Sequence, residues 1–164
     1  MPREEYNIEK ELKKWLSNAK RAVVAGIGNS MRMDDFVGVK IVQDLRGKVS
    51  ENVLLIECET VPESSTQEIV DFKPTHVLLI DAAVLDLKPG EARLFNCEQL
   101  TDFPAISTHD LPLRIFCEYV SKMTGAKIVL LLIVPEKTDF GEGLSTEVKA
   151  AADDIVRVLA ETLH

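Results

Sequence analysis

The chain has 164 residues, of which 46% are hydrophobic, and it carries a formal net charge of −8. This length fits one core of ordinary size, so residues 1–164 are expected to form a single domain. Apolar runs stay well short of the ~20 residues that a membrane helix needs, which argues against membrane insertion. The sequence has no basic patch, which argues against nucleic acid as a partner, because phosphate contacts supply most of such binding.

The cysteines are few and scattered, and none has the C-x-x-C spacing of a metal cage. An odd, scattered count argues against a disulfide framework and favours a reducing, cytoplasmic location. The N-terminus carries charges of both signs and lacks the apolar segment of a secretory signal. The three cysteines are therefore expected to be small core residues, namely Cys58, Cys97 and Cys117.

Hydrophobic periodicity predicts alternating helices and strands in the first half of the chain. Apolar residues three and four apart predict a helix over 7–19, and the apolar run 21–27 predicts a buried strand. A turn follows, and then a helix that runs to about Leu45 with Gly47 as its stop. The next expected elements are a strand near 53–58, a short helix over 63–72 and a buried strand over 76–81.

The second half continues the alternation with one irregular stretch. Apolar and polar residues alternate over 90–97, which predicts a strand with one face partly exposed to solvent. Residues 98–108 show no clear pattern. A helix is expected to start at Asp110, because Asp can cap free amides, and to stop at Gly125. The last expected elements are a core strand over 127–134 and a helix opened by Ser145.

This order of elements predicts an α/β fold with three layers, α/β/α. Strands that alternate with helices and read as apolar runs indicate a mostly parallel sheet, here five-stranded, with helices on both faces. Only residues 82–89 separate the third and fourth strands. A parallel crossover needs about a dozen residues or more, so the fourth strand is expected to be the one antiparallel strand.

Polar residues follow the ends of the predicted strands, where open α/β sheets bind ligands. Asp35 follows the first strand and Asp81 ends the third. The helix after His109 must descend to begin the fifth, parallel strand, so His109 returns to the same edge. Two carboxylates and an imidazole are therefore expected to converge. Such a set suits a borderline divalent ion such as nickel, zinc or iron, or acid–base chemistry without a metal.

Each of these residues also has a structural interpretation. Asp34 or Asp35 could cap the following helix, which would leave the other one spare. His109 could be an ordinary loop histidine. Asp81 is harder to explain in this way, because an unpaired buried carboxylate at the end of an apolar strand is costly. The combination therefore indicates a metal-recognising site more strongly than any one of its members.

Five motifs occur in a specific order and spacing: G-I-G-N-S-M-R-M-D-D-F-V-G over 26–38, P-E at 62–63, L-L-I-D-A-A over 78–83, P-G-E at 89–91 and S-T-H-D-L-P-L over 107–113. In these motifs the sequence resembles the hydrogenase maturation endopeptidases, and most closely the type that serves hydrogenase-3-like [NiFe] enzymes. The resemblance covers about residues 21–160. The family fold is a twisted five-stranded sheet between helices, which agrees with the fold predicted above.

The resemblance implies an endopeptidase that removes a C-terminal extension from the [NiFe] hydrogenase large-subunit precursor once nickel has been inserted. The substrate would supply the nickel, and none would be tightly bound in the free protein. The metal-contacting and candidate catalytic positions of the family fall on Asp35, Asp81 and His109. The same motif contains Asn29 and Asp34 as candidate substrate-binding residues. Cleavage would be of the aspartic type or assisted by nickel.

Two features depart from the family pattern. Phe36 stands where the family often has a small residue after the acidic pair, which bears on the local helix start and on substrate fit. Residues 1–20 form an N-terminal helical extension outside the motifs. This extension is expected to pack on the sheet or to contact a partner.

Two other functions fit the same residues. A non-catalytic nickel-sensing assembly module would use the three ligands to sense metal and would release the precursor uncut. A metal-free hydrolase resembling peptidyl-tRNA hydrolases, which have a similar fold, would use Asn29, His109 and an Asp. The net charge of −8 and the missing basic cleft count against this second alternative.

Overall fold

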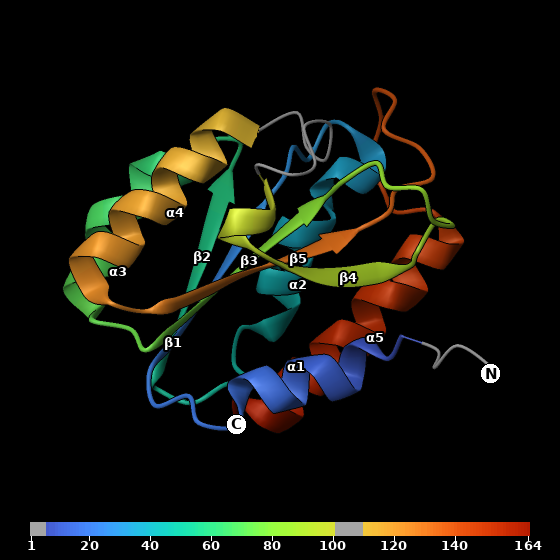
Figure 1. Ribbon diagram of the computed structural model, residues 1–164. Coiled ribbons are helices and arrows are strands. Elements are labelled where there is room, and N and C mark those ends of the chain that lie inside the picture. The colour runs from blue at the N-terminus through green and yellow to red at the C-terminus, as the bar shows by residue number, and fades with distance from the viewer. Residues whose placement is uncertain (1–5, 101–109) are drawn as a thin grey trace, which may run out of the picture.

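The computed structural model describes residues 6–100 and 110–164, and it has the predicted alternation of helices and strands (Figure 1). The strands are β1 (Ala22–Ile27), β2 (Val53–Glu59), β3 (His76–Ala82), β4 (Ala92–Asn96) and β5 (Lys127–Ile133). The α-helices are α1 (Ile8–Leu16), α2 (Val37–Leu45), α3 (Thr66–Phe72), α4 (Asp110–Thr124) and α5 (Thr146–Thr162). Short 3-10 helices precede α2 and α3 and follow β4, namely η1 (Met33–Phe36), η2 (Pro62–Ser65) and η3 (Cys97–Leu100).

The five strands form one sheet in the order β2-β1-β3-β5-β4. Four strands are parallel, and β4 pairs with β5 in the antiparallel sense. The prediction made from the short connection between the third and fourth strands is thus confirmed. The chain leaves β1 toward β2 on one side, and β3 lies on the other side of β1. The carboxyl ends of β1 and β3 therefore meet at a topological switch point, where ligands bind in open α/β sheets.

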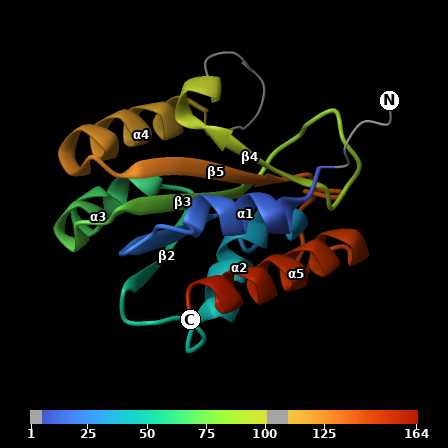
Figure 2. The same cartoon turned by 60° about the horizontal axis from the view of Figure 1, so that its bottom comes forward.

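Helices cover both faces of the sheet, as Figure 2 shows, with α3 and α4 on one face and α1, α2 and α5 on the other. The side chains of β3 divide between the two cores. Leu78 and Ile80 belong to the core under α1, α2 and α5, whereas Val77 and Leu79 face α3 and α4. The three-layer α/β/α architecture is therefore confirmed.

Helix α1 belongs to the body of the protein. Leu12 and Leu16 are buried in the same core as residues of α5. Trp15 packs edge-to-face on the ring of His76, with the ring centroids 5.0 Å apart. His76 is itself buried at the start of β3, where its Nε2 lies 3.2 Å from Oδ1 of Asn18. Of the two expectations for this extension, packing on the sheet is therefore the one that the structure confirms.

Two glycines allow the segment before α2 to lie directly on the strand ends. A Cβ atom on Gly38 would overlap the carbonyl oxygens of Ile80 and Ile27, and one on Gly28 would overlap the carbonyl oxygen of Asp35. The neighbours are backbone atoms, which cannot rotate away as side chains can. This close approach holds η1 and the first turn of α2 on the carboxyl ends of β1 and β3.

We expect Gly38→Ala to lower the free energy of unfolding by about 3 kcal/mol, because it overpacks a contact between backbone atoms. Gly47→Asn is a suitable control, since Gly47 has open space around it and a φ of 81° that asparagine tolerates. Urea unfolding of both variants measures the difference. A Gly38→Ala variant as stable as the parent would contradict this close approach.

The three cysteines are free, and Cys58 and Cys117 are buried, whereas Cys97 is only half-buried. The prediction of a core role is thus confirmed for two of them. Within residues 6–100 and 110–164, every helix is too short or too polar to cross a membrane.

Candidate active site

Asp35 lies in η1, directly after the loop that follows β1. The amide N–H of Asn29 donates a hydrogen bond to Oδ2 of Asp35 at 3.0 Å. Oδ1 of Asn29 in turn accepts from the amide of Met31 at 2.9 Å, which closes a tight turn. Both Asn29 and Asp35 are half-buried. The structure therefore brings these two predicted residues together and leaves Asp35 partly exposed to solvent.

Asp81 lies at the end of β3 and is only 1% exposed. Its Oδ1 accepts a hydrogen bond from the amide of Ala82 at 2.8 Å. Its side chain alternates along the strand with that of Ile80, and so points toward the face that α3 and α4 cover. Ile80 pairs with Gly26 near the end of β1. Asp81 therefore lies at the carboxyl edge of the sheet, beside the strand whose loop leads to Asp35.

His109 lies outside the described residues, so its approach to this edge stays a prediction. Helix α4 begins at the next residue, Asp110, and leads into β5, so the first turn of α4 lies at the carboxyl edge of the sheet (Figure 1). This helix covers the face toward which Asp81 points. The described part of the chain contains two of the three predicted ligands, and it contains no group of three or more His, Cys, Asp or Glu side chains that could hold a metal.

Asp34 has a structural role that no pattern in the sequence indicated. It is completely buried, and its carboxylate accepts four hydrogen bonds. Oδ2 accepts from the amides of Glu136 and Lys137, each at 2.9 Å, and from the hydroxyl of Ser145 at 2.7 Å. Oδ1 accepts from the amide of Ser145 at 2.7 Å. Asp34 thus joins η1 to the loop after β5 and to the start of α5.

Neither acidic residue caps α2, so the expectation that Asp34 or Asp35 caps the next helix is wrong. The N-cap of α2 is Phe36, and it makes no side-chain capping bond. The reason is the 3-10 turn η1, which contains both acidic residues and separates them from the free amides of α2. Phe36 is compatible with the helix start, because α2 begins at Val37 directly after it.

The electrostatic environment of Asp34 favours its ionised form. Burial by itself raises the pKa of this carboxyl, but the hydrogen bonds from Lys137, Ser145 and Glu136 outweigh it and hold the pKa below its ordinary value of 3.8. Asp34 is therefore a fixed, fully bonded charge under the loop that carries Asp35. Its predicted contact with substrate stays a prediction.

Backbone bonds further join the loop after β1 to the loop after β5. The amide of Met33 donates to the carbonyl of Gly141 at 3.1 Å, and the amide of Gly141 donates to the carbonyl of Met31 at 2.8 Å. Met33 has a φ of 43°, which is uncommon for a residue other than glycine. Backbone strain of this kind persists only where the surroundings impose it, and it clusters at functional sites.

The end of β2 is irregular beside the same loop. The register between β1 and β2 shifts by one residue, which leaves Cys58 as a bulge, and Glu59 has a φ of 54°. Bulges are frequent next to active sites, where they end pairing and redirect side chains. A cavity of about 330 Å³ opens here, and its lining includes Asn29, Phe36 and Glu59. Phe36 therefore borders the space next to Asn29, and its expected effect on substrate fit stays a prediction.

Comparisons with known sequences agree on one family. A family model of hydrogenase maturation proteases, HycI, matches residues 39–162. A putative hydrogenase maturation protease of Methanocaldococcus jannaschii is 36% identical over 91% of this chain and 92% of its own length. The hydrogenase 3 maturation protease of Escherichia coli is 26% identical over 84% of this chain and 87% of its own length.

A comparison with solved structures leads to the same family. The crystal structure of the [NiFe] hydrogenase maturation protease HycI from Thermococcus kodakarensis has a TM-score of 0.86 and 35% identity, over 93% of this chain and 98% of that one. These matches confirm the resemblance that the motifs indicated. The chain therefore belongs to the hydrogenase maturation protease family and is a peptidase that acts in hydrogenase maturation.

Proposed function

We propose that this protease removes a C-terminal extension from the nickel-loaded large-subunit precursor of a [NiFe] hydrogenase. One observation carries the proposal: in a chain of this family, Asp35 lies in the segment that follows β1, and Asp81 lies at the carboxyl end of the adjacent parallel strand β3. The similar structure from Thermococcus kodakarensis is of a protease named for [NiFe] hydrogenase maturation, which supports this class of substrate. The precursor is then the partner, and nickel arrives with it.

The nickel that the precursor carries is contacted by Asp35, Asp81 and His109 in this proposal. Two carboxylates and an imidazole are suitable donors for a borderline divalent ion. Asp35 suits this role because the residue is only half-buried while the amide of Asn29 holds one carboxylate oxygen in place. Asp34 supports this role of Asp35, because its four hydrogen bonds fix η1, the turn that contains both residues.

Hydrolysis requires that water add to the scissile carbonyl carbon, that the C–N bond break and that the leaving nitrogen gain a proton. In an aspartic-type route, Asp35 or Asp81 takes the proton from the attacking water. In a nickel-assisted route, the nickel in the substrate polarises the carbonyl, and the carboxylates position the substrate. Cleavage of a nickel-free precursor favours the first route. Binding of that precursor without cleavage favours the second.

Incubation with purified precursor tests the function directly. The protein should convert the nickel-loaded large subunit to a product that is shorter at its C-terminus, and intact-protein mass spectrometry measures the loss. A reaction without the protease controls for spontaneous cleavage. If the precursor binds and is then released at its original mass, the chain is a nickel-sensing assembly module and the proposed cleavage is wrong.

A further inference from the structure

Large apolar side chains are exposed at the carboxyl edge of the sheet. Each of the four parallel strands is followed by a loop that exposes one of them: Met31 after β1, Val61 after β2, Val84 after β3 and Phe140 after β5. Their exposed fractions are 46%, 43%, 75% and 81%. The loops that precede the same strands are fully described and expose no large apolar side chain, over residues 17–21, 46–52, 73–75 and 125–126.

Among the described residues, four of the eight exposed large apolar side chains lie in the loops that follow the four parallel strands, and the others are Tyr6 and three residues of α4. Single exposed apolar residues are common on soluble proteins, but a group of them at one place marks an interaction site. Two of the four lie close in sequence to the candidate catalytic carboxylates. Met31 is four residues before Asp35, and Val84 is three residues after Asp81. Their Cα atoms therefore lie at most about 14 Å and 11 Å from those of the carboxylates.

The loops that carry these side chains have fixed backbones. Gly141, next to Phe140, is bonded in both directions to the loop of Met31. The amide of Val61 donates to the carbonyl of Cys58 at 3.1 Å. The amide of Ala83, the residue directly before Val84, donates to the carbonyl of Ile133 at the end of β5 at 3.0 Å. A surface that is already ordered loses less conformational entropy on binding, so the backbone under these side chains is preorganised for binding.

We propose that Met31, Val61, Val84 and Phe140 form an apolar docking rim for the hydrogenase large-subunit precursor. This inference rests on the proposed function, because the precursor is the protein that brings its scissile bond to this edge. A protein that places a peptide bond against the two carboxylates also meets the loops after β1 and β3, which expose Met31 and Val84. The loop of Phe140 is bonded to the loop of Met31 through Gly141, and the loop of Val61 follows the strand next to β1. The surface of the precursor next to the scissile bond is then apolar rather than charged, and its burial drives docking.

The affinity of the nickel-loaded precursor for a rim variant tests this surface. The variant combines Met31→Ser, Val61→Ser, Val84→Ser and Phe140→Ser, and it is made together with Asp81→Asn so that cleavage does not consume the precursor. Biolayer interferometry measures Kd. We expect the rim changes to raise Kd by about ten-fold or more relative to Asp81→Asn alone, since truncation of central apolar contacts has effects of this size.

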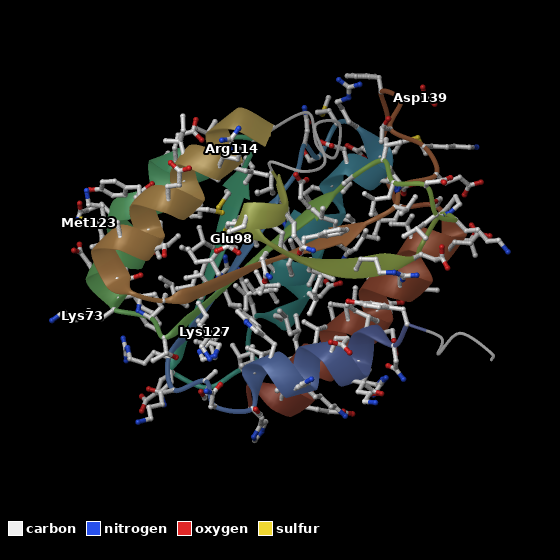
Figure 3. The ribbon with its side chains drawn as sticks, in the orientation of Figure 1. Lys73, Glu98, Arg114, Met123, Lys127 and Asp139 are labelled. Carbon is white, nitrogen blue, oxygen red and sulfur yellow. The ribbon has the colours of Figure 1, made fainter. Side chains whose placement is uncertain are left out.

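Helix α4 offers a matched control. Tyr119 and Met123 are 47% and 53% exposed, similar to the less exposed rim residues. Figure 3 labels Met123 on one side of the molecule and Asp139, the neighbour of Phe140, on the other. Tyr119→Ser combined with Met123→Ser should leave Kd within about two-fold of the Asp81→Asn reference, because these positions lie outside the rim.

The possible outcomes distinguish a failure of the docking rim from a failure of the proposed cleavage. Equal Kd values for the rim variant and the α4 variant would overturn the rim. If the parent binds the precursor through the rim but never shortens it, the rim stands and the proposed cleavage is wrong. If light scattering shows a dimer that the rim variant dissociates while Kd for the precursor is unchanged, the rim binds a second copy and the proposal is overturned. Should the combined variant unfold, Phe140→Ser and Val84→Ser are measured singly, and each must still weaken binding.

Discussion

Replacing Asp81 with asparagine is expected to lower kcat/KM for the precursor by about 10² to 10⁴, the range over which a positioned acid or base accelerates a reaction. Asparagine has the shape of aspartate, and its oxygen can still accept the bond from the amide of Ala82. The fold should therefore be retained while the negative charge is lost. That charge has a part in both proposed routes, because Asp81 contacts the nickel of the precursor and is one of the two carboxylates that can take the proton. Initial rates of precursor shortening, followed by mass spectrometry, measure the loss.

Asp139→Asn is the charge-matched control for this experiment. Asp139 is an exposed residue of the loop after β5, at the same edge of the sheet (Figure 3). Its replacement removes one negative charge without touching the strand ends, so kcat/KM should stay within about two-fold of the parent. An Asp81→Asn variant that is folded and cuts at the parental rate would remove Asp81 from the site.

Asp35→Asn tests whether the two carboxylates act together. If both contact one nickel or one water, the double variant with Asp81→Asn should lose little more than either single variant, because residues that act as a unit are strongly non-additive. Multiplied losses in the double variant would mean that Asp35 and Asp81 have separate tasks. The same rate assay measures all three variants.

Most of the fold could be predicted because it depends on patterns within short segments. The apolar runs near 21–27 and 76–81 have the length and composition of buried strands, and the structure has β1 and β3 there. The antiparallel direction of β4 followed from the length of one connection. The parallel direction of the other strands then determined that their carboxyl ends share one edge of the sheet. The position of Asp81 at that edge was therefore predictable before any contact was known.

The surroundings of Asp34 could not be predicted in this way. Its partners lie 102 to 111 residues further along the chain, in a loop that has no periodicity. The only local signal was the pair of adjacent acidic residues, and helix capping was the natural interpretation of that pair. The 3-10 turn η1 removed both from a capping position. The contact of Gly38 with the backbone of Ile27 and Ile80 could not be predicted for a similar reason, because it depends on how α2 packs on β1 and β3.

Asp34→Asn is expected to lower the free energy of unfolding at neutral pH by about 3 kcal/mol. Hydrogen bonds to a buried charged group contribute roughly 1.5–3 kcal/mol each, and a buried donor left without an acceptor costs about 1–3 kcal/mol. Asparagine offers one oxygen where the carboxylate offers two, so the amide or the hydroxyl of Ser145, or a neighbouring amide, loses its partner. Urea unfolding measures the change. Asp139→Asn, which removes an exposed carboxylate, should stay within about 0.5 kcal/mol of the parent.

The pH dependence of this difference identifies its cause. The pKa of Asp34 is lower in the folded protein than its ordinary value of 3.8. Its stabilising contribution is therefore complete above that ordinary value and is lost as the pH falls through the lower, folded pKa. The gap between the parent and Asp34→Asn should be constant from about pH 7 to about pH 5 and should narrow below about pH 4. A gap that is the same in acid as at neutral pH would mean that the ionised carboxylate does not hold η1 to the start of α5, and that the position of Asp35 depends on the turn at Asn29 and on the backbone bonds to Gly141 instead.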